Sequence, residues 1–304
     1  MKKLALINSY CNTWGKLSIL HDNILKLKEL GIDSLVYSPL PLPKEITEIA
    51  DYTIISKDNP IIYWPERGMI HWQDFPTFTP TLIAPDYGWA SFYQYKKLME
   101  YGSTLDYDYY YWFLYDVIIE DEVLECLNNP KDKLFFPHLK AKTSKVGALF
   151  ASFSKENIKL LHPLFNKESY IKVNKGVIAE KFLEYASKKI QGEYSTYNVK
   201  DKFDEHGSLN FNVLDNHYPF KLALDNKKLL FGFYDLPPTT TRVTFSINDL
   251  YYDFDLTLNN NLINFNLDIN SIKSVVFHYE NNHPLDLTQH FNNSTDIIRL
   301  IETP

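Results

Sequence analysis

Leu4-Ala5-Leu6-Ile7, near the start of the chain, is a short apolar run that predicts a buried strand. Apolar residues then recur at helical spacing over 17–30, and Gly31 marks the end of that helix. Two further strand-like segments, 32–38 and 51–55, follow with a short helix between them. Strands alternating with helices in this way predict a mostly parallel sheet that is covered by helices on both faces.

The alternation continues to about residue 200, where the character of the sequence changes. We expect further strands over 106–119 and 146–153, and helices over 88–101 and 175–190. From residue 205 onward, short strand-like segments are separated by Asn, Asp and Pro turns, which is typical of a small all-β, sandwich-like unit. The sequence therefore predicts an α/β domain over 1–204 and a β-rich domain over 205–304.

Composition and charge narrow the classes of function. The chain has 304 residues and a formal net charge of -7, so a basic surface for nucleic acid is not expected. Cys11 and Cys126 form no redox or metal-type pair, which favours a reduced, cytoplasmic setting. No apolar stretch reaches the roughly 18 residues that a membrane span requires. We expect a soluble protein with no membrane span, and peripheral membrane association stays open.

Polar side chains follow the first two predicted strands. Asn8, Ser9 and Tyr10 come directly after the first strand, and Tyr37 and Ser38 close the second. Ligands of open α/β sheets bind beyond the carboxyl ends of the strands. These five residues are therefore the predicted contacts of a nucleotide.

One acidic residue stands at the end of the most aromatic strand. In Phe113-Leu114-Tyr115-Asp116-Val117, an apolar run delivers Asp116 to the edge of the sheet. A carboxylate is a suitable hard ligand for a divalent metal that bridges the phosphates of a nucleotide-sugar. The alternative interpretation is a helix N-cap, because helices often begin after Asp.

The segment 113–121 resembles the strand-to-acid segment of glycosyltransferases with the GT-A fold, most closely the family-2 type. The preceding residues 86–109 resemble the same family in their order of Gly-containing helix, polar side chain and strand. The resemblance covers residues 1 to about 200. If Asp116 is the second acid of the family's Asp-any-Asp motif, the first acid of the motif is missing here.

The resemblance implies a GT-A-like (Rossmann-like) α/β fold and a nucleotide-sugar donor, UDP- or GDP-linked, with Mn²⁺ or Mg²⁺ at Asp116. It also implies that Gln94 and Lys97 approach the sugar or phosphate. Glu180, placed at the start of a helix, would be the base that takes the acceptor proton. The other interpretation of Glu180 is an ordinary first-turn acid favoured by the helix dipole. His206 is a candidate second metal ligand, although a lone His more often makes local hydrogen bonds.

The function that the sequence indicates is transfer of a sugar from a nucleotide-diphosphate sugar to a hydroxyl acceptor, with a surface glycan as the expected acceptor. Three alternatives stay open. One is a non-catalytic glycan-binding protein with a degenerate transferase domain, which the single acid would explain. The others are a glycosyltransferase acting on modified DNA bases and a nucleotidyltransferase, although the Gly-rich basic loop of the latter is missing after the first strand.

Overall fold

The structure is a computed structural model in which residues 1–64, 84–130, 135–136, 149–174, 180–194, 221–225, 228–233, 236–258, 262–268, 271–279, 284–286 and 288 are described. The chain forms two compact units. The first comprises Met1–Tyr10 and Asp22–Lys202, and the second comprises Cys11–His21 and Phe203–Pro304. The domain boundary at residue 204 stays a prediction.

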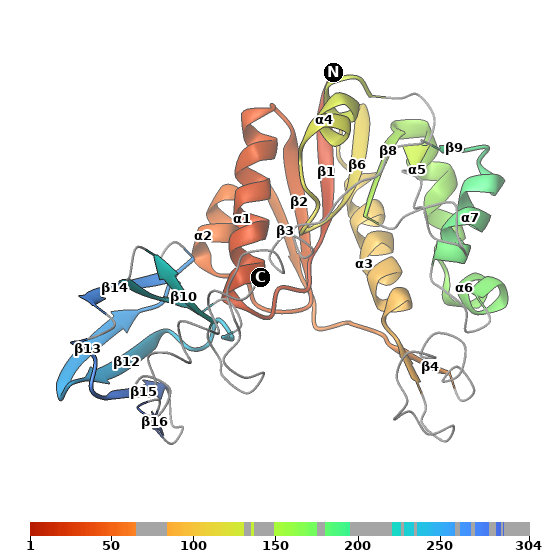
Figure 1. Ribbon diagram of the computed structural model, residues 1–304. Coiled ribbons are helices and arrows are strands. Elements are labelled where there is room, and N and C mark those ends of the chain that lie inside the picture. The colour runs from red at the N-terminus through yellow and green to blue at the C-terminus, as the bar shows by residue number, and fades with distance from the viewer. Residues whose placement is uncertain are drawn as a thin grey trace. The chain divides into compact units, whose positions relative to one another are not determined.

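A seven-stranded sheet forms the centre of the first unit, in the order β3-β2-β1-β6-β8-β7-β9 (Figure 1). β8 runs antiparallel to both of its neighbours, and the other pairs are parallel. The predicted mostly parallel α/β sheet is therefore confirmed. The strands are β1 (Lys3–Asn8), β2 (Asp33–Ser38), β3 (Tyr52–Ile55), β6 (Tyr109–Leu114), β7 (Phe135–Phe136), β8 (Phe150–Ser154) and β9 (Glu193–Tyr194).

Helices lie on both faces of this sheet, as the sequence predicts. Leu6 and Trp112 face a core cluster that includes Phe92 of helix α3. On the opposite face, the hydroxyl of Tyr111 donates to the carbonyl of Leu127 in helix α4 at 3.1 Å. The helices are α1 (Trp14–Glu29), α2 (Lys44–Ile49), α3 (Tyr87–Gly102), α4 (Asp121–Asn128), α5 (Lys155–Leu161), the 3-10 helix η2 (His162–Leu164), α6 (Lys167–Asn174) and α7 (Glu180–Lys189), and a small antiparallel pair joins β4 (Ile62–Trp64) to β5 (Ala84–Asp86).

An aromatic cluster centred on Phe92 fastens α3 to the elements around it. The Phe92 ring centroid lies 6.1 Å from that of Trp112 in β6 and 5.7 Å from that of Phe165. It also lies 5.7 Å from Tyr170 in α6 and 5.4 Å from Phe182 in α7. Phe92 is fully buried, so its burial couples the sheet to helices α6 and α7 and to Phe165, which directly follows η2.

The second unit contains two antiparallel sheets, which confirms the predicted all-β character of the C-terminal part. One sheet has the order β10-β11-β14 and the other β13-β12-β15-β16. The ring of Phe233, just after β11, packs on Phe245 and Phe277 of the second sheet. The strands are β10 (Lys221–Asp225), β11 (Lys228–Gly232), β12 (Arg242–Ile247), β13 (Leu250–Asp255), β14 (Leu262–Asp268), β15 (Val275–Tyr279) and β16 (Leu285–Asp286).

The turn between β12 and β13 shows how local sequence fixes the register of that hairpin. Asn248 and Asp249 have φ values of 50° and 65°. Two-residue hairpin turns of type I′ require positive φ at both central positions, which Asn and Asp tolerate better than most other side chains. In addition, none of the helices described in the structure is long and apolar enough to cross a membrane.

The aromatic cluster gives a prediction about stability. Phe92→Ala should lower the free energy of unfolding by about 3–5 kcal/mol, because it removes a fully buried ring and leaves a cavity. Leu160→Ala is the control, since Leu160 is 57% exposed and should shift stability by no more than about 0.5 kcal/mol. Urea unfolding followed by circular dichroism measures both. Equal values for the two variants would show that the cluster does not hold the fold.

Candidate functional site

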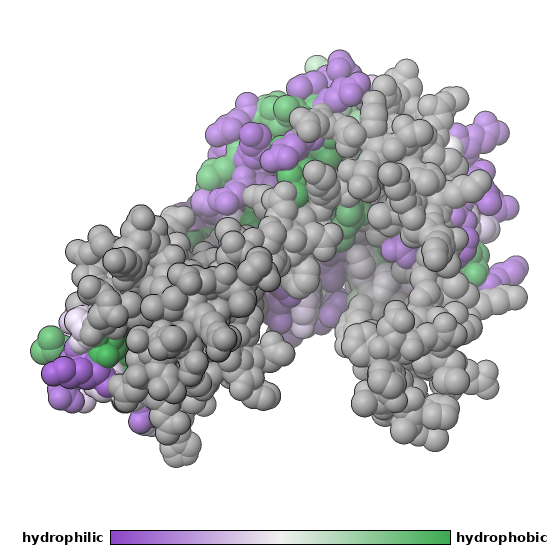
Figure 2. All heavy atoms as spheres, in the orientation of Figure 1, coloured by the Kyte–Doolittle hydropathy of each residue, from purple (hydrophilic) through white to green (hydrophobic). Residues whose placement is uncertain are grey.

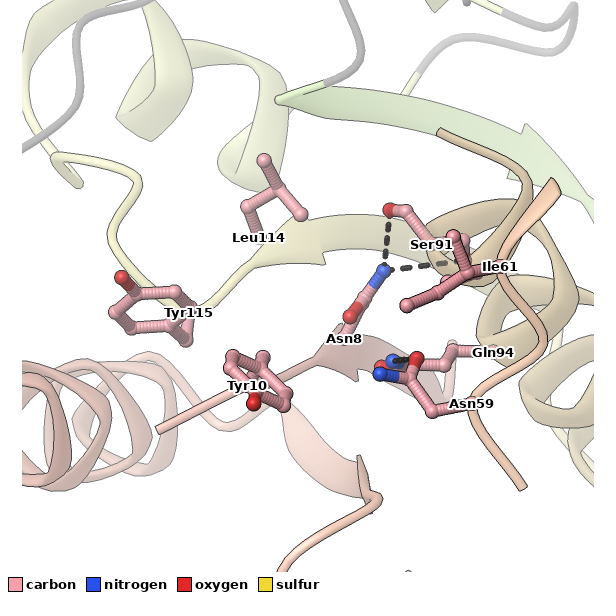
Figure 3. Close-up of a pocket in the computed structure, with 9 residues that line it drawn as sticks. Asn8, Tyr10, Asn59, Ile61, Ser91, Gln94, Leu114 and Tyr115 are labelled. Carbon is pink, nitrogen blue, oxygen red and sulfur yellow. Dashed lines mark hydrogen bonds between the residues drawn. The ribbon is translucent and has the colours of Figure 1, made fainter. Parts of the chain in front are cut away.

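A cavity of about 530 Å³ lies at the carboxyl ends of β1 and β6 (Figure 3). These two strands pair in parallel with Asn8 opposite Leu114. From β1 the chain builds β2 and β3 on one side and then β6 on the other, so the cavity lies where the direction of strand addition reverses. Open α/β sheets bind their ligands at such switch points. The lining residues are Asn8, Tyr10, Asn59, Ile61, Ala90, Ser91, Gln94, Leu114 and Tyr115.

Asn8, the last residue of β1, is held in one orientation by helix α3. Its Nδ2 donates to Oγ of Ser91 at 2.7 Å and to the Ser91 carbonyl at 3.1 Å. A carbonyl oxygen can only accept, so the nitrogen of the amide must face Ser91. Figure 3 shows the Asn8 oxygen turned away from Ser91. The site therefore contains a fixed hydrogen-bond acceptor at the end of β1.

A second amide pair lines the cavity. Nε2 of Gln94 donates to Oδ1 of Asn59 at 3.3 Å. The Gln94 side chain is only 3% exposed, and its Oε1 accepts no hydrogen bond from the part of the chain that the structure describes. A buried acceptor without a donor is uncommon in native proteins and marks a place where a ligand or water completes the bonding.

Two tyrosine rings complete the lining. Tyr10 is 46% exposed and Tyr115 is half-buried. In Figure 3 these rings lie on one side of Asn8, and the Asn59–Gln94 pair lies on the other. The backbone N–H of Tyr115 donates to the Asn8 carbonyl at 3.1 Å, which ties the two strand ends together. Aromatic faces of this kind can stack on a planar base or on a sugar ring.

Asp116 lies in a tight turn that directly follows the cavity-lining Tyr115. Nδ2 of Asn23, a buried residue of α1, donates to the carbonyls of Tyr115 and Val117 at 2.8 and 2.9 Å. Asp116 itself is half-buried and is not one of the lining residues. The alternative that Asp116 caps a helix is wrong, because α4 begins at Asp121 with Glu120 as its N-cap.

Ser9, Tyr37 and Ser38 are buried at the strand ends and bond within the protein instead of lining the cavity. Oγ of Ser9 donates to the Tyr37 carbonyl at 2.9 Å, and Oγ of Ser38 donates to the Leu40 carbonyl at 2.8 Å. The Tyr37 hydroxyl donates to the carbonyl of Asp58 at 3.1 Å. Burial raises the pKa of Tyr37, so its hydroxyl stays protonated and continues to donate.

Lys97 and Glu180 also lie outside the cavity lining. Nζ of Lys97 pairs with Glu100 at 2.7 Å and lies 5.7 Å from the ring centroid of Tyr93. The hydrogen bond to Glu100 raises the pKa of Lys97, which therefore stays charged. Glu180 is the half-buried first residue of α7. His206 lies outside the described residues.

Asn59 and Ser91 are lining residues that the sequence interpretation did not select. The signal for Asn59 was its position just after the strand at 51–55, at the same edge of the sheet as Asn8. The signal for Ser91 was its place three residues before Gln94, which puts both on one face of the predicted helix. Both positions can be recognised in the sequence, but Asn and Ser are too common at such positions to indicate a binding site by themselves.

No group of three or more His, Cys, Asp or Glu residues that could hold a metal is found within the described residues. The lining residues that the structure describes also include no carboxylate. However, Mg²⁺ is often held by one or two carboxylates together with the phosphates of its substrate. The half-buried carboxylate of Asp116 fits that smaller requirement.

No family model and no curated protein matches the sequence. Among solved structures, a glycosyltransferase involved in the glycosylation of the major capsid of PBCV-1 is 12% identical, with a TM-score of 0.35 over 67% of this chain and 82% of that chain. A putative nucleotide-diphospho-sugar transferase from Desulfovibrio desulfuricans G20 is 12% identical, with a TM-score of 0.37 over 64% and 79%. The galactosyltransferase LgtC, solved with donor and acceptor sugar analogues, is 13% identical, with a TM-score of 0.37 over 63% and 73%.

The turn at Asp116 gives a second prediction. Asn23→Ala should lower the free energy of unfolding by about 2–3 kcal/mol, because the Tyr115 and Val117 carbonyls both lose a buried donor. Lys26→Ala, on the exposed face of the same helix, should change it by no more than about 0.5 kcal/mol. Thermal and urea unfolding measure the difference. A loss no larger than that of the control would mean that Asn23 does not hold this turn.

Proposed function

We propose that this protein is a glycosyltransferase that moves a sugar from a nucleotide-diphosphate sugar to a hydroxyl group of a glycan. The observation that carries the proposal is the cavity at the switch point between β1 and β6, lined by amides and tyrosines. Amide groups and aromatic rings are suited to bind a base or a sugar. The GT-A-like sheet places this cavity beside the turn that holds Asp116.

The donor would lie across the end of β1, with Asn8, Tyr10 and Gln94 in contact with it. Ser9 supports this edge by its hydrogen bond to the Tyr37 carbonyl at the end of β2, and Tyr37 and Ser38 bond to the carbonyls of Asp58 and Leu40 in the segments that follow β3 and β2. Asp116 and the donor's phosphates would hold Mg²⁺ or Mn²⁺, with His206 as a proposed further ligand. When bound, the metal would neutralise the negative charge of the departing diphosphate.

The reaction itself requires one bond to form and one to break. The acceptor hydroxyl oxygen attacks the anomeric carbon, and the bond from that carbon to the diphosphate oxygen breaks, so its electron pair leaves with the diphosphate. In an inverting reaction, the acceptor proton passes to a carboxylate. We assign this role to Glu180, because it is a half-buried acid at the start of a helix.

Donor binding is the first test of this function. UDP- and GDP-sugars with Mn²⁺ should raise the melting temperature, since a ligand present at about 100 times its Kd adds about 2.7 kcal/mol to the stability of the folded state. A non-catalytic glycan-binding protein would respond to glycans and not to these donors. Differential scanning fluorimetry over a panel of nucleotide-sugars separates the two. A panel without any shift would contradict the proposed donor class.

Catalysis is tested at Asp116. Asp116→Asn should lower the rate of donor hydrolysis or sugar transfer by about 100-fold or more, because the carboxylate that would hold the metal is lost, and with it the cation that would neutralise the leaving diphosphate. Asp249→Asn is the matched control, since Asp249 is exposed in a turn of the second unit where Asn is equally tolerated. Release of the nucleoside diphosphate measures the rate. Full activity in Asp116→Asn would remove the central role of this residue.

A further inference from the structure

The described residues that line the cavity at the ends of β1 and β6 carry no charge. The nearby cation, Lys97, is engaged by Glu100 at 2.7 Å and is not a lining residue. A phosphate taken into this space would therefore lose its hydration without gaining a cationic partner from the described lining. Burying an unpaired charge is strongly unfavourable, whereas a neutral polar ring can be bound by hydrogen bonds alone.

The polar groups that line the cavity are rich in acceptors. Asn8 commits its nitrogen to Ser91, which leaves its Oδ1 for another donor. Gln94 Oε1 is buried and has no donor from the described chain. A ligand that offers N–H or O–H groups would satisfy both oxygens, and a ligand with only acceptors would leave them unpaired.

Asn59, the partner of Gln94, is held in place by the residue that precedes it. The hydroxyl of Tyr37 donates to the Asp58 carbonyl at 3.1 Å, and the hydroxyl of Tyr93 reaches Oδ2 of Asp58 at 3.3 Å. Tyr93 lies on α3, one residue before Gln94, so one helix supplies both the anchor and the partner of this loop. The amide pair is thus positioned before a ligand arrives, which lowers the entropic cost of binding.

We infer that Asn59 and Gln94 form a specificity-determining amide pair that selects an uncharged ring with N–H or O–H donors, and that Tyr93 is a positioning residue acting through Asp58. The inference rests on the proposed function, because the ring would belong to the nucleotide-sugar donor as its base or its sugar. The diphosphate then lies outside the cavity, toward Asp116.

Isothermal titration calorimetry on the full chain tests this. Uridine and guanosine form one arm, D-glucose and D-galactose form a second, and inorganic pyrophosphate forms a third. We expect one of the first two arms to bind, with an affinity that changes less than about twofold between low and high salt because no ion pair forms. Binding of pyrophosphate alone, or of none of these neutral rings, would overturn the inference.

A double-mutant-type cycle, in which one change is made in the protein and one in the ligand, separates a direct hydrogen bond from a structural effect. Gln94→Leu should weaken binding of the neutral ring by roughly tenfold, and so should an analogue whose N–H or O–H is methylated or removed. The variant and the analogue together should cost no more than either alone, since both remove the same hydrogen bond. If the losses in binding free energy from the variant and from the analogue add up, Gln94 does not bond to the group that the analogue lacks, and its role is overturned. A variant that only disturbs the structure would leave the effect of the analogue unchanged.

Two further variants locate the anchor. Tyr93→Phe, which removes only the hydroxyl that reaches Asp58, should weaken binding roughly threefold and leave the melting temperature of the free protein close to that of the wild type. Lys96→Met, a half-buried position on the same helix, should leave binding unchanged. Unchanged binding in Tyr93→Phe would remove the positioning role.

Failure of this inference and failure of the proposed function give different results. Neutral rings that bind with the expected cycle, in a protein that neither transfers nor hydrolyses any donor, would leave the amide pair intact and remove the enzyme. If the protein transfers sugar but Gln94→Leu binds the donor as tightly as the wild type, the enzyme activity stands and the role of the amide pair is overturned.

Discussion

The parallel pairing of β1 with β6 is the constraint on which the site depends. It brings Asn8 opposite Leu114 and lets the Tyr115 N–H donate to the Asn8 carbonyl. Side chains alternate between the faces of a strand, so a shift of one residue would turn Trp112 out of the aromatic core and displace the strand ends. The core therefore fixes the register, and the register fixes the distance between the amide at the end of β1 and the turn at the end of β6.

Helix α3 connects that core to the cavity, because one of its faces packs in the core and another lines the cavity. Phe92 and Tyr95 are buried in the aromatic cluster, whereas Ser91 and Gln94 line the cavity. Burial raises the pKa of Tyr95 well above its ordinary value, and the negative charge of Asp116 raises it further, so the hydroxyl stays neutral beside the acid. A rigid helix with a buried aromatic face holds its polar face in place, which is the condition for selective hydrogen bonding.

The sequence predicted most of the fold, because alternating buried strands and amphipathic helices leave a strong periodic signal. It also predicted which edge of the sheet carries the cavity, since Asn8 and Tyr10 follow a strand directly. It could not separate Asn8 from Ser9, because neighbouring polar residues at a strand end look equivalent until the structure shows which one lines the cavity. Asn59 was missed because its role depends on a contact with Gln94, 35 residues away, that no local pattern records.

The distribution of charge around the cavity suits a donor that has both a neutral part and an anionic part. The described lining is uncharged. Asp116 lies in the next turn, which Asn23 holds by hydrogen bonds to the carbonyls of Tyr115 and Val117. A carboxylate facing a diphosphate would repel it unless a cation lay between them. Asp116 could therefore assist donor binding only if a metal ion were held between the carboxylate and the diphosphate. Asp116 is not one of the lining residues, so its charge stays outside the amide-lined cavity, where the described lining offers no counterion. A neutral cavity and a separate acidic turn would therefore bind the two parts of a nucleotide-sugar by different interactions.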